Sequence, residues 1–340
     1  MSLFRAERRR LFKRRFTKYM LLIGILVLGA IVAGTWFTNQ KIGPAQQAAA
    51  ERRAEAQYQE NVVRTDQIRV QCQSEKDSGQ LGGIGDKVPD CAQIQPPPRE
   101  AFEAKWFLPP TFNFKTGFES TVTVFAGILA LVAFVVGASF VGAEWNTGGM
   151  MNLLLWRPRR LQVLTGKLST LLLGLFGVTV VLGALWTAAF WLIGTYRGTT
   201  AKMTPGTWQS FGLTGLRAMG LILVFGTIGF AIASFGRHTA MALGTAIGVG
   251  VIGFIGVGIA LSMVGVRLME RFLWPTYLQA WMEKKKVLQN FDSCNFDFSQ
   301  GECRPQEYLI TWQQSGVIMA AVVLLTVGLA YWSIRRRDVT

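Results

Sequence analysis

Charge is scarce in this sequence. Asp, Glu, Lys and Arg make up only 16% of its 340 residues, whereas 50% of the residues are hydrophobic. A soluble protein of this length usually carries about 25% charged residues. The deficit is concentrated in six long stretches with almost no charge, each near or above the roughly 20 residues that a helix needs to cross a bilayer. The predicted spans are residues 19–37, 118–143, 168–196, 213–236, 239–265 and 308–334.

These stretches also lack the alternation of apolar and polar residues that marks a membrane barrel, and backbone groups in lipid must be satisfied within the segment. The sequence therefore predicts an all-α polytopic membrane protein with six transmembrane helices. Acidic and basic residues are nearly absent from the span cores, which speaks against ion or proton coupling within the spans.

Catalytic motifs are missing too. The single histidine, His238, cannot supply the two helical ligands of a zinc protease. A phosphate-binding loop needs Ser or Thr after its Lys, but Leu168 follows Lys167, and the required preceding glycine is absent. We therefore expect no catalytic residue, metal or cofactor. If the chain drives transport, the energy comes from another subunit.

The formal charge of +15 is unevenly spread. With the N-terminus inside, the inner segments carry 16 of the 35 Lys and Arg residues, eight of them in residues 1–18, against three acidic residues. Positive charge accumulates on the cytoplasmic side of membrane proteins. The pattern predicts a multi-pass protein of the cell membrane with both termini cytoplasmic, including the basic tail 335–340, and it makes a nucleic-acid partner unnecessary.

Only four cysteines are present, and all fall in predicted outer segments. Cys72 and Cys91 lie in the long loop 38–117, and Cys294 and Cys303 lie in the stretch 266–307. This placement suits disulfides formed outside the cytoplasm. The simplest pairing joins Cys72 to Cys91 and Cys294 to Cys303, although three connectivities are open.

The segments between the spans suggest further structure. Residues 1–18 are either a basic interfacial helix or a solvated tail that only fixes orientation. The loop 38–117 is long enough for an outer domain, and residues 266–307 contain an amphipathic stretch before the second cysteine loop. In the fifth span, Gly244 and Gly248 have the spacing that allows close helix packing.

The inner segment 144–167 is the most informative. A glutamate stands where the second span ends, a glycine follows four residues later, and a leucine run, a Pro-Arg pair and a lysine at the next span come after it. These features are Glu144, Gly148, Leu153 to Leu155, Pro158 with Arg159, and Lys167. The pattern resembles the membrane subunit of type-2 ATP-binding-cassette exporters. The alternative is an ordinary basic inner loop.

The resemblance implies that residues 144–160 form a coupling helix that docks into a separate cytoplasmic ATPase subunit, with a second permease copy or a sibling completing the transporter in the bilayer. It implies polar contacts from the charged residues and an apolar anchor from the others. The expected coupling residues are Glu144, Trp145, Gly148, Leu154, Trp156, Arg157, Arg159 and Arg160.

The resulting function would be outward transport of an unidentified substrate. A second reading of the sequence is a membrane-anchored sensing or assembly protein whose disulfide-stapled outer regions bind a partner. Six charge-free spans exceed what an anchor requires.

Overall fold

The computed structural model describes residues 3–78, 91–156, 159–290 and 306–336. These residues form two compact units. The first, here called the bundle unit, comprises Met1–Ala33, Lys115–Phe190 and Ala201–Thr340; the second, the α3 unit, comprises Gly34–Phe114 and Trp191–Thr200.

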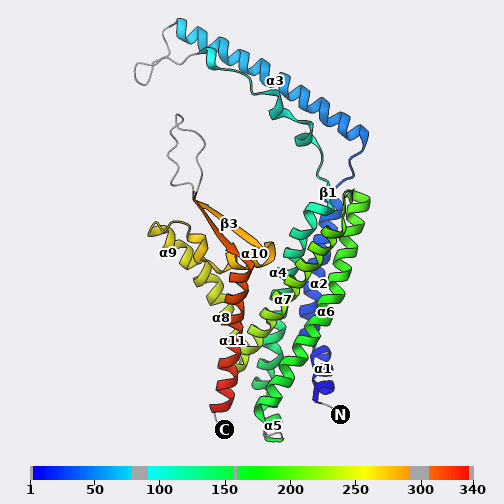
Figure 1. Ribbon diagram of the computed structural model, residues 1–340, viewed down its shortest axis with the longest axis vertical. Helices are drawn as coiled ribbons and strands as arrows, with labels where there is room; N and C mark the ends of the chain where they lie inside the picture. The colour runs from blue at the N-terminus through cyan, green and yellow to red at the C-terminus, as the bar shows by residue number, and fades with distance from the viewer. Residues whose placement is uncertain (1–2, 79–90, 157–158, 291–305, 337–340) are drawn as a thin grey trace. The chain divides into compact units, whose positions relative to one another are not determined.

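Within the described residues, six helices are long and apolar enough to cross a membrane, as the sequence predicted. They are α2 (Arg15–Thr38), α4 (Phe114–Asn146), α6 (Arg160–Arg197), α7 (Pro205–Gly236), the continuous helix Thr239–Met263, and α11 (Trp312–Arg336). The fifth is made of α8 (Thr239–Gly250), a π-helical segment η4 (Val251–Gly256) and α9 (Val257–Met263). A further helix, α1 (Leu3–Lys13), precedes α2, and the end of α11 lies at the same end of the bundle unit as α1 (Figure 1).

Local signals fix the boundaries of α7 and α8. Thr204 caps α7 by accepting a hydrogen bond from the amide of Thr207, and Pro205 occupies the first helical position, where its missing N–H costs nothing. Arg237 then adopts a left-handed conformation with φ 54°. His238 caps α8, because its Nδ1 accepts a hydrogen bond from the amide of Ala240 at 3.1 Å. The lone histidine thus serves as a helix cap in a tight turn.

Small residues let α4 and α7 approach closely. A Cβ at Gly229 would collide with the backbone carbonyl of Phe134, and a Cβ at Gly137 would collide with the carbonyl of Gly226. Close backbone approach of this kind is how helices associate in membranes. Gly244 and Gly248, the glycines that the sequence singled out, instead have nothing within 4 Å in the described chain.

Between the fifth and sixth spans the structure adds a β-hairpin. After η5 (Met269–Phe272) and α10 (Trp274–Glu283), β3 (Lys285–Asn290) pairs antiparallel with β4 (Gln306–Thr311). Ala280 of α10 packs with Leu288 and Ile310 of the two strands. The sequence placed residues 308–311 in the sixth span, but they are extended, because an apolar run does not distinguish a strand from the start of a helix. Cys294 and Cys303 lie outside the described residues.

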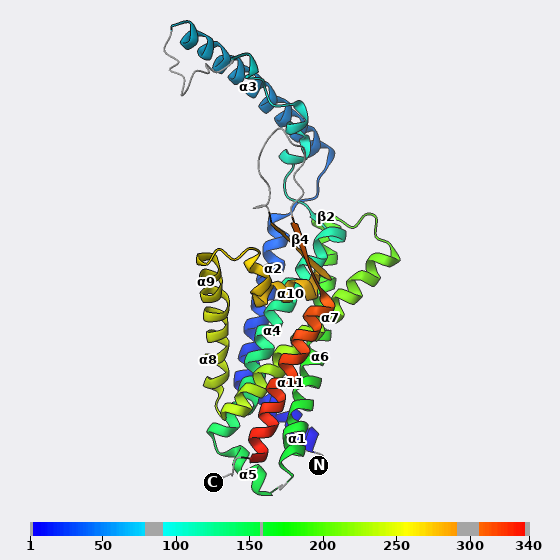
Figure 2. The same ribbon diagram turned by 60° about the vertical axis from the view of Figure 1, so that its left-hand side comes forward.

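The α3 unit is built on one long helix, α3 (Pro44–Asp77). Three short 3₁₀ segments run back along it: η1 (Cys91–Gln93), η2 (Arg99–Phe102) and η3 (Ala104–Phe107), as Figures 1 and 2 show. A disulfide joins Cys72 to Cys91, which confirms that predicted pair. At the ends of its two chain segments the unit also contains a short parallel pair, β1 (Phe112–Asn113) with β2 (Gly198–Thr199).

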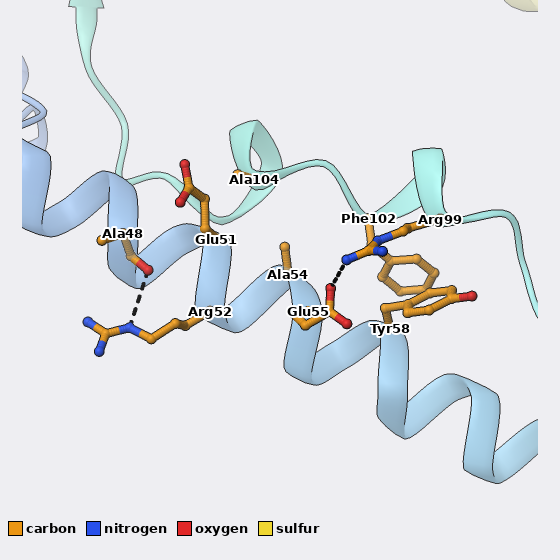
Figure 3. Close-up of a pocket in the computed structure, with 9 residues that line it drawn as sticks. All are labelled: Ala48, Glu51, Arg52, Ala54, Glu55, Tyr58, Arg99, Phe102 and Ala104. Carbon is orange, nitrogen blue, oxygen red and sulfur yellow. Dashed lines mark hydrogen bonds and ion pairs between the residues drawn. The ribbon is translucent and has the colours of Figure 1, made fainter.

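Polar and aromatic contacts fasten the returning segment to α3. Arg99 forms an ion pair with Glu55, and the Tyr58 and Phe102 rings meet edge to face with centroids 5.8 Å apart (Figure 3). These four residues are among those that line a shallow open pocket of about 670 Å³ on α3. Because Arg99 also lies 5.8 Å from the Tyr58 ring centroid, a cation of the chain itself already occupies the aromatic face.

Candidate coupling site

A short helix lies within the segment that the sequence singled out. α4 ends at Asn146, Gly148 turns the chain with φ +71°, and α5 (Gly149–Trp156) follows for eight residues before α6 begins at Arg160. A positive φ is easily adopted only by glycine, which explains this residue at the turn. Met150 is completely buried and ties α5 to the bundle unit, at the same end as α1 (Figure 1).

A buried charge network lies next to the start of α5. Lys167, with no solvent exposure, places its Nζ 2.8 Å from Oε2 of Glu7 and 2.7 Å from Oε2 of Glu144. The three residues come from α6, α1 and α4, so one ammonium joins three helices. Lys167 donates a hydrogen bond to Glu7, whereas its contact with Glu144 is an ion pair without hydrogen-bond geometry.

Two carboxylates around one ammonium leave an excess negative charge in a buried position, and removing a partner from such a cluster is costly. Arg10 partly offsets the excess, since its Nη1 lies 3.5 Å from Oε1 of Glu7. We call Glu7, Glu144 and Lys167 the inner charge cluster, after the side of the membrane on which the charge distribution of the sequence predicts them.

Arg14, at the junction of α1 and α2, provides a second link to α4. Its guanidinium donates hydrogen bonds to the carbonyl oxygens of Ser139 at 3.0 Å and Phe140 at 2.9 Å. Two cations lie near the buried Phe140 ring, with Arg14 5.8 Å and Lys167 5.4 Å from its centroid. Contacts between cations and aromatic faces strengthen when they are desolvated. The start of α2 is therefore fixed to the end of α4.

The turn between α7 and α8 packs on the same end of α4. The Arg237 guanidinium lies 4.9 Å from the Trp145 ring centroid. Gly142 faces the start of α8 so closely that a Cβ there would lie 2.6 Å from the amide nitrogen of Thr239. Trp145 thus holds two spans together beside α5.

The predicted coupling residues fall into two groups. Glu144 and Trp145 are engaged inside the bundle unit, and Glu144 is only 8% exposed. Arg159 is exposed and Arg160 half-buried at the start of α6. Leu154 and Trp156 belong to α5, but their side chains are not among those described, and Arg157 lies outside the described residues.

Sequence reasoning missed the role of Glu7 and Arg14. Two features of the sequence pointed to Glu7. It is the one acidic residue among the basic residues of 1–18, and Lys167, a charged residue at the start of an apolar span, needs a partner. Beside the inner charge cluster, an open pocket of about 430 Å³ is lined by Arg10, Lys13, Arg14, Glu144 and Gly149. Its rim is therefore mostly basic.

Within the described residues, six long apolar helices and a short helix between the second and third of them define a helical membrane protein. The family model described as ABC-2 family transporter protein matches residues 7–339. The chain therefore belongs to the ABC-2 transporter family and has the role of a permease subunit of an ABC transporter. No curated protein matches the chain.

Proposed function

We propose that the chain is the membrane-spanning half of an ABC exporter that moves its substrate outward, driven by a separate cytoplasmic ATPase. Family membership supports the permease role, and the lack of a phosphate-binding loop in the sequence supports ATP hydrolysis by another subunit. Both termini and α5 then face the cytoplasm, as the distribution of positive charge favours. A second permease, identical or sibling, completes the transporter.

The observation that carries the proposal is the position of α5 next to the inner charge cluster, where Glu144 and the first residue of α5, Gly149, line the same pocket. In this mechanism α5 contacts the ATPase, and the change between ATP-bound and ATP-free states of that subunit moves it. Glu144 belongs to the last turn of α4, Lys167 to α6 and Glu7 to α1, so a displacement of α5 would reach three helices through one buried cluster. Met150 is completely buried, so a movement of α5 would displace the residues of the bundle unit that surround this side chain.

The two groups of residues would have different roles. Arg157, Arg159 and Arg160 would make polar contacts to the ATPase, and the apolar residues of α5, including Leu154 and Trp156, would form the anchor. Glu144 and Trp145 would act inside the permease, because their side chains are directed to Lys167 and Arg237. Gly148 would set the angle between α4 and α5 through its positive φ.

The test is co-purification of the tagged chain with a cytoplasmic ABC ATPase of the same cell. The double variant Arg157→Glu with Arg159→Glu should lose the ATPase, because acidic residues replace both proposed docking charges. Arg64→Glu, an exposed arginine of α3, is the matched control and should retain it. A wild-type chain that retains no ATPase, or a double variant that retains as much as the control, contradicts the proposal.

A further inference from the structure

The bundle unit contains a half-enclosed cavity of about 370 Å³ between α4, α6 and α7. It lies toward the end of the bundle unit opposite to α1 and α5, because its residues belong to the first turns of α4 and α7 and the later half of α6. No charged residue lines it. The volume is within the roughly 300–1,000 Å³ typical of ligand pockets. Its walls include Phe118, Phe125, Trp186, Trp208, Phe211 and Gly215.

Glycines keep this space open. A Cβ added at Gly212 or Gly215 would meet no atom within 4 Å, and one at Gly183 would meet only the Phe125 ring, at 3.9 Å. The aromatic walls are held by one another: the Trp186 ring centroid lies 5.5 Å from that of Phe125. Such ring pairs are rigid and well packed. The cavity is therefore preformed.

The cavity opens on the apolar surface of the helices, since Val180 and Leu216 line it and are 49% and 68% exposed. A polar group lies beside its aromatic end. Ser210 donates a hydrogen bond to Oε1 of Glu119 at 2.8 Å, and Lys284 donates one to Ser210 Oγ at 3.0 Å. Glu119 and Ser210 are the sequence neighbours of two phenylalanines that line the cavity.

We propose that this cavity binds one acyl chain of a zwitterionic membrane phospholipid, which enters sideways from the bilayer. Uncharged aromatic and aliphatic walls accept a hydrocarbon chain, and the lateral opening would face the hydrocarbon region of the bilayer, where such chains are abundant. At the polar end, the Lys284 ammonium attracts the lipid phosphate and the Glu119 carboxylate attracts the positive group of the head. A headgroup with both charges fits this pair better than a free carboxylate does. The binding is independent of any ATPase.

Photolabelling of the full chain tests the site. The protein is reconstituted in phosphatidylcholine vesicles that contain a trace of phosphatidylcholine with a diazirine in the middle of one chain, and labelled peptides are mapped by mass spectrometry. Label should concentrate on the peptides that contain Phe125 and Trp186. Gly215→Leu should lower this labelling about tenfold, because the new side chain excludes the equivalent of about two buried methylenes. Gly212→Leu should act in the same direction.

The matched control is Gly127→Leu, an exposed glycine of α4 that also has nothing within 4 Å and does not line the cavity. It should leave labelling unchanged. A diazirine fatty acid in the same vesicles separates the two sources of an acyl chain and should label less, and Lys284→Gln should lower only the phospholipid signal. Stronger labelling by the fatty acid, or equal labelling of wild type and both cavity variants, overturns the proposal.

Discussion

Removal of the Lys167 ammonium should be among the most damaging single changes in the bundle unit. In Lys167→Met the apolar stem is preserved, but Glu7, 1% exposed, and Glu144, 8% exposed, face each other without their shared cation. Breaking a buried ion pair by removing one partner costs about 3–5 kcal/mol. The Arg10 guanidinium, 3.5 Å from Glu7 and 57% exposed, recovers only a small part of this.

We therefore expect Lys167→Met to lower the free energy of unfolding by about 4 kcal/mol, close to a thousandfold in the folding equilibrium. The assay is equilibrium unfolding of the purified chain in mixed micelles by titration with a denaturing detergent. Lys18→Met, an exposed lysine of α2, is the control and should shift stability by less than about 0.5 kcal/mol. Glu7→Gln should cost more than Glu144→Gln, since only Glu7 accepts a hydrogen bond from Lys167.

The triple variant Glu7→Met, Glu144→Met, Lys167→Met decides whether the charges or the packing volume stabilise the site. Replacing a whole buried ion cluster by apolar residues of similar size is often neutral or stabilising, whereas breaking it is not. The triple variant should therefore be nearly as stable as the wild type. If Lys167→Met unfolds like the control, or if the triple variant is as unstable as the single one, the electrostatic reasoning is wrong.

Three further changes have defined outcomes. Cys72→Ser should lower the stability of the α3 unit by about 3 kcal/mol, read as faster proteolysis of residues 91–107, with the spans unaffected. The Gln59 amide and the Arg99 guanidinium lower the pKa of Glu55. The contribution of Glu55 to stability is therefore present above its unfolded pKa and is lost as the pH falls through its folded pKa. Hydrogen exchange of residues 99–107 should rise over that pH range in the wild type and not in Glu55→Gln. Gly229→Val should destabilise the bundle unit by about 1–3 kcal/mol in the same micelle unfolding assay, because its Cβ meets a backbone carbonyl of α4.

The sequence was sufficient for the number of spans, because span length and the absence of charge are local properties of each segment. It was not sufficient where one apolar run can form either a strand or the first turn of a helix. Residues 308–311 continue the apolar run of the sixth span, yet they pair with β3 as a strand, and the partner strand lies about twenty residues earlier in the chain. Pairing between distant segments cannot be read from hydropathy.

The coupling segment shows the same division. Its position and the short helix within it follow from residues close in sequence, including the glycine at positive φ. The partner of Glu144 does not, because Lys167 reaches it from another helix and brings in Glu7, 160 residues away from that lysine. A charge in an apolar span implies that a partner exists, but only the packing of three helices identifies it.

The inner charge cluster also bears on the N-terminal segment, for which the sequence left open an interfacial helix or a solvated tail. A solvated basic tail would leave its single glutamate and its leucines in water, whereas Glu7 is 1% and Leu11 2% exposed. The buried face of α1 holds the ends of α4 and α6 together. An apolar contact could hold these helix ends together with equal stability, but it would not specify which residues meet. Lys167 donates a hydrogen bond to Glu7 and forms an ion pair with Glu144, so one ammonium defines the point at which α1, α4 and α6 meet.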